Sequence, residues 1–261
     1  MDAQADWSFA RSPKWIASHV GVVLLVVAMV IAGVWQINRY RDRADRNELI
    51  RDRAEMAAVD IGEIAPPAAD PVLGEEQQFR RVTATGEFRD ADSVLIRNRT
   101  FEGAPGFWVL TPLVNDEGWA VAVNRGWIPS SDIPDAPTGR VQIDGYVQPA
   151  RTAEGFQVAD PAEGRLDSLA RPDVARLAQQ LDYPLSPVVF QLAAEGFEDP
   201  SDGPDRAVPF LLSLPSLDGG PHASYAAQWF IFTTIALIGY PLVLRRVAGG
   251  RSSSAPEYDE E

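Results

Sequence analysis

The chain has 261 residues, a formal net charge of −14, no cysteine and only two histidines, His19 and His222. Residues 55–218 hold 12 arginines and 27 carboxylates, for a net charge near −15, but no histidine, lysine or cysteine. That segment therefore excludes a cysteine nucleophile, a Ser-His-Asp triad, a Cys/His zinc site, c-type haem attachment and disulfides, and its negative field repels nucleic acid.

The first predicted element is an apolar run over residues 15–38 that contains no charged side chain. At about 1.5 Å per helical residue, some 20 residues cross a bilayer core of about 30 Å. A cleaved signal peptide is the alternative, but the core "VGVVLLVVAMVIAGVW" is long for one, and "QINRYRDR" follows instead of a small-residue cleavage site. We predict a transmembrane helix here, preceded by a cytoplasmic N-terminus over residues 1–14.

Residues 39–64 alternate arginine with acidic side chains. Opposite charges spaced four residues apart stabilise a helix, so we predict that the first helix continues here as a charged stalk. The proline-rich sequence "APPAADP" at residues 65–71 ends it.

Residues 65–218 are predicted to form one β-rich domain. Short runs of β-branched and aromatic residues alternate with Gly, Asp, Asn and Pro turns. The predicted strands are 79–88, 93–99, 106–114, 119–128, 139–147 and 186–194, with "NDEG" at 115–118 as a hairpin connection and one helix at 171–182. This pattern predicts a mainly antiparallel sheet or small barrel with one or two helices.

A second apolar run covers residues 219–244. Tyr225 and Trp229 near one end, with Arg245 and Arg246 after the other, fit the aromatic belt and basic flank of a transmembrane helix better than a buried core helix. The fold class is therefore a membrane α+β protein with two transmembrane helices flanking one extracytoplasmic β-rich domain. The tail, residues 245–261, is predicted to be cytoplasmic and disordered.

The orientation rests on the distribution of arginine and lysine. Basic residues after the second run and before the first place both termini in the cytoplasm. The arginines of the stalk lie on the predicted outer side and argue against this orientation. We expect both termini inside, and the conflict stays open.

The sequence "VNRGWIP" at residues 123–129 gathers polar and aromatic side chains. One interpretation is a strand that ends in a turn, with Trp127 packed and Pro129 ending the ladder. The other is a surface at which Arg125 and Trp127 contact a partner protein.

Several segments together resemble one family. "WQINRYRDRADRNELI", "FRRVTATGEF", "GFWVLTPLV", "VNRGWIP" and "HASYAAQWF" occur in the order found in the Surfeit locus protein 1 family of membrane assembly factors for cytochrome c oxidase. The resemblance covers roughly residues 14–246. It implies a chaperone-like protein of the plasma (inner) membrane, in contact with lipid, whose partners are the oxidase catalytic subunit and haem-a biosynthetic proteins. It also implies haem a as a transient cofactor, with His222 implicated. Family members commonly read asparagine-histidine-leucine where this chain has Pro221, His222 and Ala223.

The residues around His222 suit such a cofactor. His222, Tyr225, Ala226 and Trp229 share one helix face by their spacing. Imidazole is a common ligand of haem iron, and aromatic rings can flank a flat macrocycle. The first span reaches the same membrane boundary with three further candidates, Trp35, Gln36 and Arg39.

Within that set, His222 is the candidate iron ligand; the alternative is an interfacial histidine that hydrogen-bonds lipid or backbone. Arg39 could pair with a haem propionate. His19 begins the first span, about 24 Å along the helix from Trp35, so it cannot ligate the same iron.

Three functions remain at this stage. The first is an oxidase assembly factor that binds or presents haem a without catalysing a reaction. The second is a structural or regulatory membrane partner of the oxidase that binds no haem. The third is a hydrolase that uses paired carboxylates, although no spacing singles out such a pair.

Overall fold

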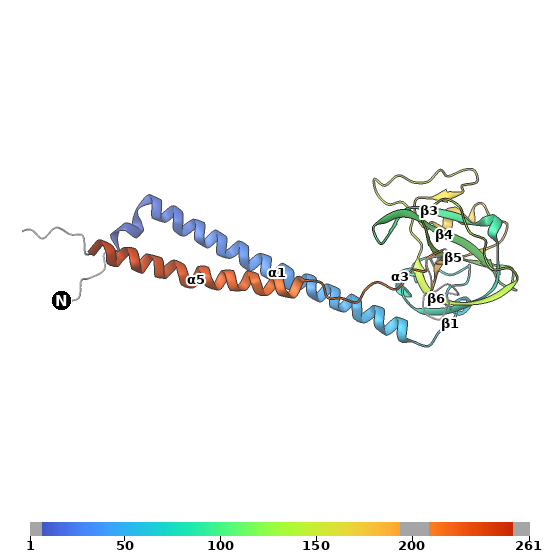
Figure 1. The fold of residues 1–261 in the computed structure, drawn as a ribbon, viewed down its shortest axis with the longest axis horizontal. Helices are drawn as coiled ribbons and strands as arrows, with labels where there is room; N and C mark the ends of the chain where they lie inside the picture. The colour runs from blue at the N-terminus through green and yellow to red at the C-terminus, as the bar shows by residue number, and fades with distance from the viewer. Residues whose placement is uncertain (1–6, 194–208, 253–261) are drawn as a thin grey trace, which may run out of the picture. The chain divides into compact units, whose positions relative to one another are not determined.

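The protein is described by a computed structural model over residues 7–193 and 209–252. It divides into a helical unit, formed by residues up to Glu48 and from Leu217 onward, and a β domain over Leu49–Ser216. Figure 1 shows the long helices α1 and α5 of the first unit and the strands of the second.

Two long helices account for the apolar runs. A short 3-10 helix, η1 (Ser8–Arg11), precedes α1 (Pro13–Glu55), and α5 spans His222–Ser252. Helix α1 passes without interruption through residues 15–38 into the charged segment, but it ends before residue 64. Helix α5 continues beyond residue 244, so residues 245–252 are helical and not the disordered chain we predicted. Residues 253–261 of that predicted tail lie outside the described residues.

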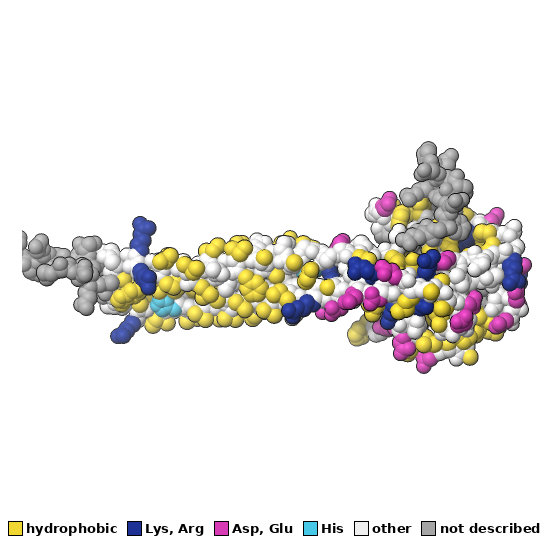
Figure 2. All heavy atoms as spheres, turned by 90° about the horizontal axis from the view of Figure 1, so that it is seen from below, with side chains coloured by type: hydrophobic (Ala, Val, Ile, Leu, Met, Phe, Trp, Pro, Cys, Tyr) yellow, Lys and Arg dark blue, Asp and Glu magenta, His cyan; other side chains and the backbone are white. Residues whose placement is uncertain are grey.

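Both helices are long and apolar enough to cross a membrane. Their most apolar windows have mean hydropathies of 2.6 and 1.6, and only 11% and 6% of those windows are buried. A core helix of a soluble protein would be mostly buried. Figure 2 shows a band of hydrophobic side chains on the helical unit, with Lys and Arg side chains toward its two ends. This exposure supports the membrane interpretation.

Small residues bring the two helices together. A Cβ added to Gly33 of α1 would lie 2.9 Å from Cζ of Phe230 on α5, so the ring packs directly on the glycine backbone. Ala226 of α5 is also buried. Close approach at small residues is the usual way that helices associate in lipid.

The β domain contains every predicted strand, with ends shifted by a few residues. The strands are β1 (Val59–Asp60), β2 (Arg81–Phe88), β3 (Val94–Phe101), β4 (Ala104–Val114), β5 (Ala120–Ile128), β6 (Arg140–Pro149), β7 (Ser168–Leu169) and β8 (Leu185–Leu192). The short helices are α2 (Ile61–Ile64), α3 (Leu73–Glu76), η2 (Asp90–Asp92) and α4 (Val174–Ala178). Residue 194 of the last predicted strand lies outside the described residues.

The sheet closes into a small barrel. Its strand order is β1-β2-β6-β8-β5-β4-β3-β7, and an additional pairing of β2 with β4 joins β2, β6, β8, β5 and β4 into a ring. Three pairs are parallel, β1 with β2, β3 with β7 and β5 with β8, and the other five are antiparallel. The predicted membrane α+β fold with a mainly antiparallel small barrel is confirmed.

Strand β5 divides the core into two clusters. Val121 and Val123 belong to one cluster with Phe190, whereas Ala120 and Ala122 belong to a second. Successive side chains of a strand point to opposite faces, so both faces of β5 are covered. This explains why every residue from Ala120 to Ile128 is buried.

The predicted helix at 171–182 is much shorter in the structure. Only Val174–Ala178 is α-helical, and the side chain of Asp173 accepts a hydrogen bond from the backbone N–H of Arg176 as the N-cap. Asp173 supplies the capping oxygen and is therefore the N-cap. Pro172 precedes this cap and so lies before the first turn.

Candidate functional site

A turn places His222 at the start of α5. Asp218 Oδ1 accepts a hydrogen bond from the backbone N–H of Gly220 at 2.9 Å, and Gly220 adopts a φ of 62°, which favours glycine. The backbone N–H of Tyr225 then bonds to the carbonyl of Pro221, closing the first helical turn. His222 is consequently the first residue of α5.

His222 contacts the first helix through one ring nitrogen. Its Nδ1 lies 2.7 Å from Oε1 of Gln36. An amide oxygen only accepts hydrogen bonds, so Nδ1 is the donor in this contact, and in the neutral ring Nε2 then keeps its lone pair. Nε2 has no hydrogen-bond partner among residues 7–193 and 209–252. The structure thus brings together two residues that the sequence analysis selected independently on the two helices.

The other candidate residues of α5 differ in exposure. Ala226 is 5% exposed and Trp229 is half-buried, where its ring meets that of Phe232 edge-on with centroids 6.3 Å apart. Tyr225 is 49% exposed. The predicted common face therefore holds His222, Ala226 and Trp229 against the helix pair, and Tyr225 lies at its outer margin.

The candidates of α1 lie on the surface of the helical unit, apart from Gln36. Trp35 is 54% exposed. Arg39 makes an exposed ion pair with Asp42, one turn along the helix, at 3.8 Å. Exposed pairs of this kind contribute little to stability, so the guanidinium is easily released to another anion.

Three residues that the sequence analysis did not select hold the chain that leads into α5. The side-chain amide of Asn47 donates to the backbone carbonyls of Leu217 and Asp218, at 2.9 and 3.2 Å. Arg43 forms an exposed ion pair with Asp218 at 3.8 Å. These contacts join positions about 170 residues apart in sequence, and no local pattern indicates them.

His19 lies at the other end of the helix pair. Its Nδ1 is 2.6 Å from the hydroxyl of Tyr240 on α5, and its Nε2 is 3.1 Å from the carbonyl of Ala10. The Tyr240 hydroxyl also bonds to Oγ of Ser18. Both ring nitrogens of His19 therefore have partners, and the ring joins η1, α1 and α5.

In the β domain, Arg125 is buried and only 6% exposed. Its guanidinium donates to the carbonyls of Pro134 and Asp135, at 2.9 and 2.8 Å, and lies 3.6 Å from Asp90. Burial lowers the pKa of Arg125, although Asp90 and Asp135 act in the opposite direction. The side chain binds the loop after β5, so its contacts lie within the domain.

Trp127 is also buried, and 4% of it is exposed. Its indole N–H donates to the carbonyl of Arg99 at 3.0 Å, and its ring packs against Phe101 and Phe210. In this conformation, neither Trp127 nor Arg125 offers a partner protein a direct contact, and the strand-and-turn interpretation describes their surroundings.

His222 offers one ring nitrogen, Nε2, as a candidate metal ligand. Among the residues that the structure describes, no group of three or more His, Cys, Asp or Glu side chains lies close enough to hold a metal ion. A metal bound through His222 must therefore bring most of its own ligands, as the iron of a macrocycle does.

Comparisons with known proteins agree with the motifs. The sequence profile of the SURF1 family matches residues 23–234. An uncharacterized SURF1-like protein of Mycobacterium tuberculosis is 28% identical over 237 residues, 89% of this chain and 84% of that protein. Surfeit locus protein 1 of Xenopus tropicalis is 27% identical over 151 residues, 52% of this chain and 46% of the relative. The cytochrome oxidase assembly protein SHY1 of Saccharomyces cerevisiae is 25% identical over 109 residues, 41% of this chain and 26% of the relative. Because the profile extends from one apolar helix to the other, the chain belongs to the SURF1 family.

Proposed function

We propose that this protein takes part in the assembly of cytochrome c oxidase and holds haem a at the helix ends beside His222. The family supports the assembly role, since the yeast relative is named as a cytochrome oxidase assembly protein. The observation that carries the haem assignment is the hydrogen bond between His222 Nδ1 and Gln36 Oε1.

That hydrogen bond prepares the ring for a metal. Histidine ligands commonly donate the N–H of one ring nitrogen to an oxygen acceptor, which fixes the tautomer and aims the other nitrogen. Gln36 is such an acceptor, and Nε2 is the nitrogen left with a lone pair and without a partner in the described chain. His222 is therefore a residue that could hold the iron of a haem.

The neighbouring side chains suit the rest of a haem. Trp35 and Tyr225 expose about half of their surface and can cover a flat apolar ring. Trp229 adds a half-buried ring on the same helix as His222. Among the residues that the structure describes, Arg39 is held only by its exposed pair with Asp42, so it can donate charge-assisted hydrogen bonds to a propionate.

In this proposal the protein binds haem a and presents it to the oxidase, without catalysing a reaction. A bound haem would supply the redox-active iron that the oxidase requires. His222 would hold that iron by one bond, and the exposed margin at Tyr225 would leave the group accessible to the catalytic subunit. The proteins that make haem a are the corresponding donors, and the protein acts as a chaperone for the cofactor.

Absorption spectroscopy tests the haem assignment. Protein purified from haem-a-producing membranes is expected to show a Soret band, which His222→Ala should abolish while His19→Ala retains it. Circular dichroism of both variants checks that the helices persist. A colourless wild type that still supports oxidase assembly and binds no added haem a would instead favour a structural or regulatory partner of the oxidase.

The proposed location is the plasma membrane, with both termini in the cytoplasm and the β domain outside. Because the chain has no cysteine, single-cysteine variants give an unambiguous labelling test. Ser130→Cys in the β domain should react with an impermeant maleimide in intact spheroplasts, and Ser254→Cys only after permeabilisation. The reverse labelling pattern would place the β domain in the cytoplasm, as the stalk arginines suggest.

A further inference from the structure

The connection between β6 and β7 stands apart from the rest of the β domain. It covers residues 150–167 without regular secondary structure. Loops longer than about 12–15 residues are uncommon in compact domains and are usually either disordered or functional. In Figure 1 this yellow loop extends past β3 at the margin of the domain.

The second half of this loop is fixed to the domain by buried polar contacts. Asp160 is 6% exposed in its side chain, where it pairs with Arg97 and accepts the backbone N–H of Ala170 at 2.8 Å. Arg176, itself 6% exposed, donates to the carbonyls of Pro161 and Gly164. These contacts offset part of the conformational cost of ordering the second half of the loop.

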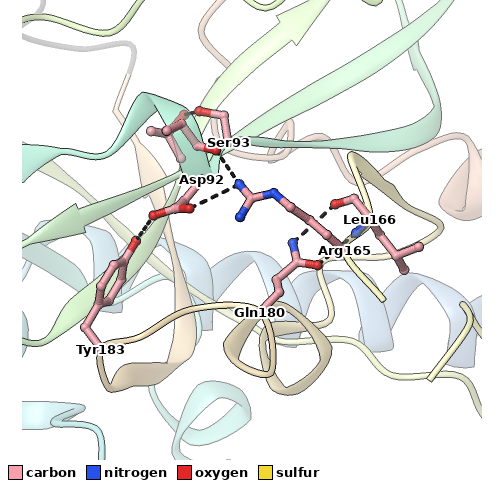
Figure 3. Close-up of polar contacts among 8 residues, drawn as sticks. Asp92, Ser93, Arg165, Leu166, Gln180 and Tyr183 are labelled. Atoms are coloured by element: carbon pink, nitrogen blue, oxygen red, sulfur yellow. Dashed lines mark hydrogen bonds and ion pairs between the residues drawn. The ribbon is translucent and has the colours of Figure 1, made fainter. Parts of the chain in front are cut away.

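A second set of contacts fixes the end of the loop. Figure 3 shows the carboxylate of Asp92 between the hydroxyl of Tyr183 and the guanidinium of Arg165, at 2.8 and 3.1 Å. Gln180 makes a pair of hydrogen bonds with the backbone of Leu166. Burial and the hydrogen bond to Asp92 raise the pKa of Tyr183, so its phenol remains a donor at physiological pH.

The tip that these contacts support is apolar and fully exposed. Phe156 has a relative exposure of 109% and Val158 of 84%, higher than the other exposed large hydrophobic side chains of the described chain. The guanidinium of Arg171 donates to the carbonyl of Val158 at 3.1 Å and so contacts the backbone of the tip. Anchoring a loop while leaving its aromatic side chain in water pre-organises a contact that is completed by another molecule.

The charge around the tip indicates the kind of partner. Glu154 and Glu163 are exposed residues of this loop, before and after Phe156 in the sequence, and neither forms an ion pair within the described residues. The arginines at the two ends of the loop are neutralised, Arg151 by Glu75 and Arg165 by Asp92. The segment 55–218 has a net charge near −15 from its 12 arginines and 27 carboxylates, so the tip lies in a negative field, with the guanidinium of Arg171 at Val158 as a local positive charge. Such a field repels anionic lipid and a second copy of the chain.

We propose that the loop tip, defined by Glu154, Phe156, Val158 and Glu163, is a docking site for a partner protein with an apolar cleft edged by lysine or arginine. Phe156 fills the cleft, and the two glutamates pair with the basic rim. This site is independent of the one at His222. Its failure would leave the haem proposal unaffected.

Photocrosslinking of the full-length protein in its native membrane tests this site. With p-benzoyl-phenylalanine at position 156, we expect one protein adduct whose mapped contact peptide contains basic residues. The control places the same probe at Val72, which is also exposed but lies outside the loop, before β2 in the chain. Adducts with lipid only, with a second copy of this chain, equally from both positions, or none at all would overturn the proposal.

Two variants separate the apolar and charged parts of the contact. For the partner so mapped, Phe156→Ala should weaken binding about 30-fold, as expected for a central anchor residue. Glu154→Lys with Glu163→Lys should weaken it about ten-fold at low salt, with a smaller effect at high salt. Unchanged affinity in either variant, with native circular dichroism, would contradict the proposal.

Discussion

The two ends of the helix pair each carry one histidine, and the two rings are used differently. At one end, both nitrogens of His19 are hydrogen-bonded, to Tyr240 and to the carbonyl of Ala10. At the other, within the described part of the chain, His222 is hydrogen-bonded through Nδ1 alone, toward Gln36. A ring with two partners fastens the helices, whereas a ring with one partner is oriented and still has a donor nitrogen to offer.

Within the helical unit, the His19 end serves helix packing and the His222 end is available for binding. Polar contacts between helices in lipid contribute modest stability, on average about 0.6 kcal/mol. The His19 contacts are therefore replaceable by other packing. The lone pair on His222 has no such substitute, because no other histidine or cysteine lies in the described part of the helical unit near it. Variants at the two ends should accordingly affect different measurements.

The largest effect is expected from Gln36→Leu. Losing the oxygen that accepts the Nδ1 proton leaves the tautomer and ring angle of His222 free, which typically weakens metal binding about 10–100-fold. Titration with haem a, followed by absorption, measures the affinity. Gln228→Leu, at an exposed position of α5, is the matched control. Equal affinities for Gln36→Leu and the wild type would remove the orienting role from Gln36.

An effect of comparable size, on stability instead of affinity, is expected from Gly33→Val. The new side chain meets the ring of Phe230, so the helices must separate near the His222 end, at a cost of about 1–3 kcal/mol. The control is Gly21→Val, since nothing lies within 4 Å of a Cβ at Gly21. Thermal unfolding in detergent, together with haem content, measures both consequences. If both variants melt alike, the contact at Gly33 does not hold the helices together.

The smallest effect is expected from Tyr240→Phe at the His19 end. Removing one hydroxyl deletes the contacts to His19 and Ser18 and should cost about 1 kcal/mol of helix-pair stability. Haem binding should remain at the wild-type level. Loss of haem in this variant, with normal helicity, would show that the two ends are coupled and that helix packing at His19 is not independent of haem binding at His222.

The helices and strands were predictable because their signals are local. Long apolar runs and period-two patterns specify α1, α5 and the six longer strands without knowledge of the rest of the chain. The two-residue strands β1 and β7 have no such signal, because they exist only through their partners β2 and β3. The length of the predicted helix at 171–182 was overestimated because Asp173, inside the expected segment, is the N-cap at which the helix begins.

The site was predictable only as a set of residues. Helical spacing brought His222, Ala226 and Trp229 to one face, and antiparallel spans placed Gln36 near that face. The hydrogen bond that selects the tautomer of His222 depends on the rotation of α1 against α5, which no single helix specifies. The role of Asn47 was missed for the same reason, since it donates to backbone carbonyls of residues that follow the β domain in the chain, Leu217 and Asp218.

The closure of the barrel also affects the order in which its strands can pair during synthesis. Strand β2 meets β4 through only two residue pairs, and its long partner is β6, about 60 residues later in the chain. During synthesis, an edge of β2 must therefore wait for β6, and pairings between distant strands form slowly. An unpaired edge is prone to associate with other chains. The domain should thus depend on folding helpers until β8, which ends at residue 192 and pairs with both β5 and β6, has emerged.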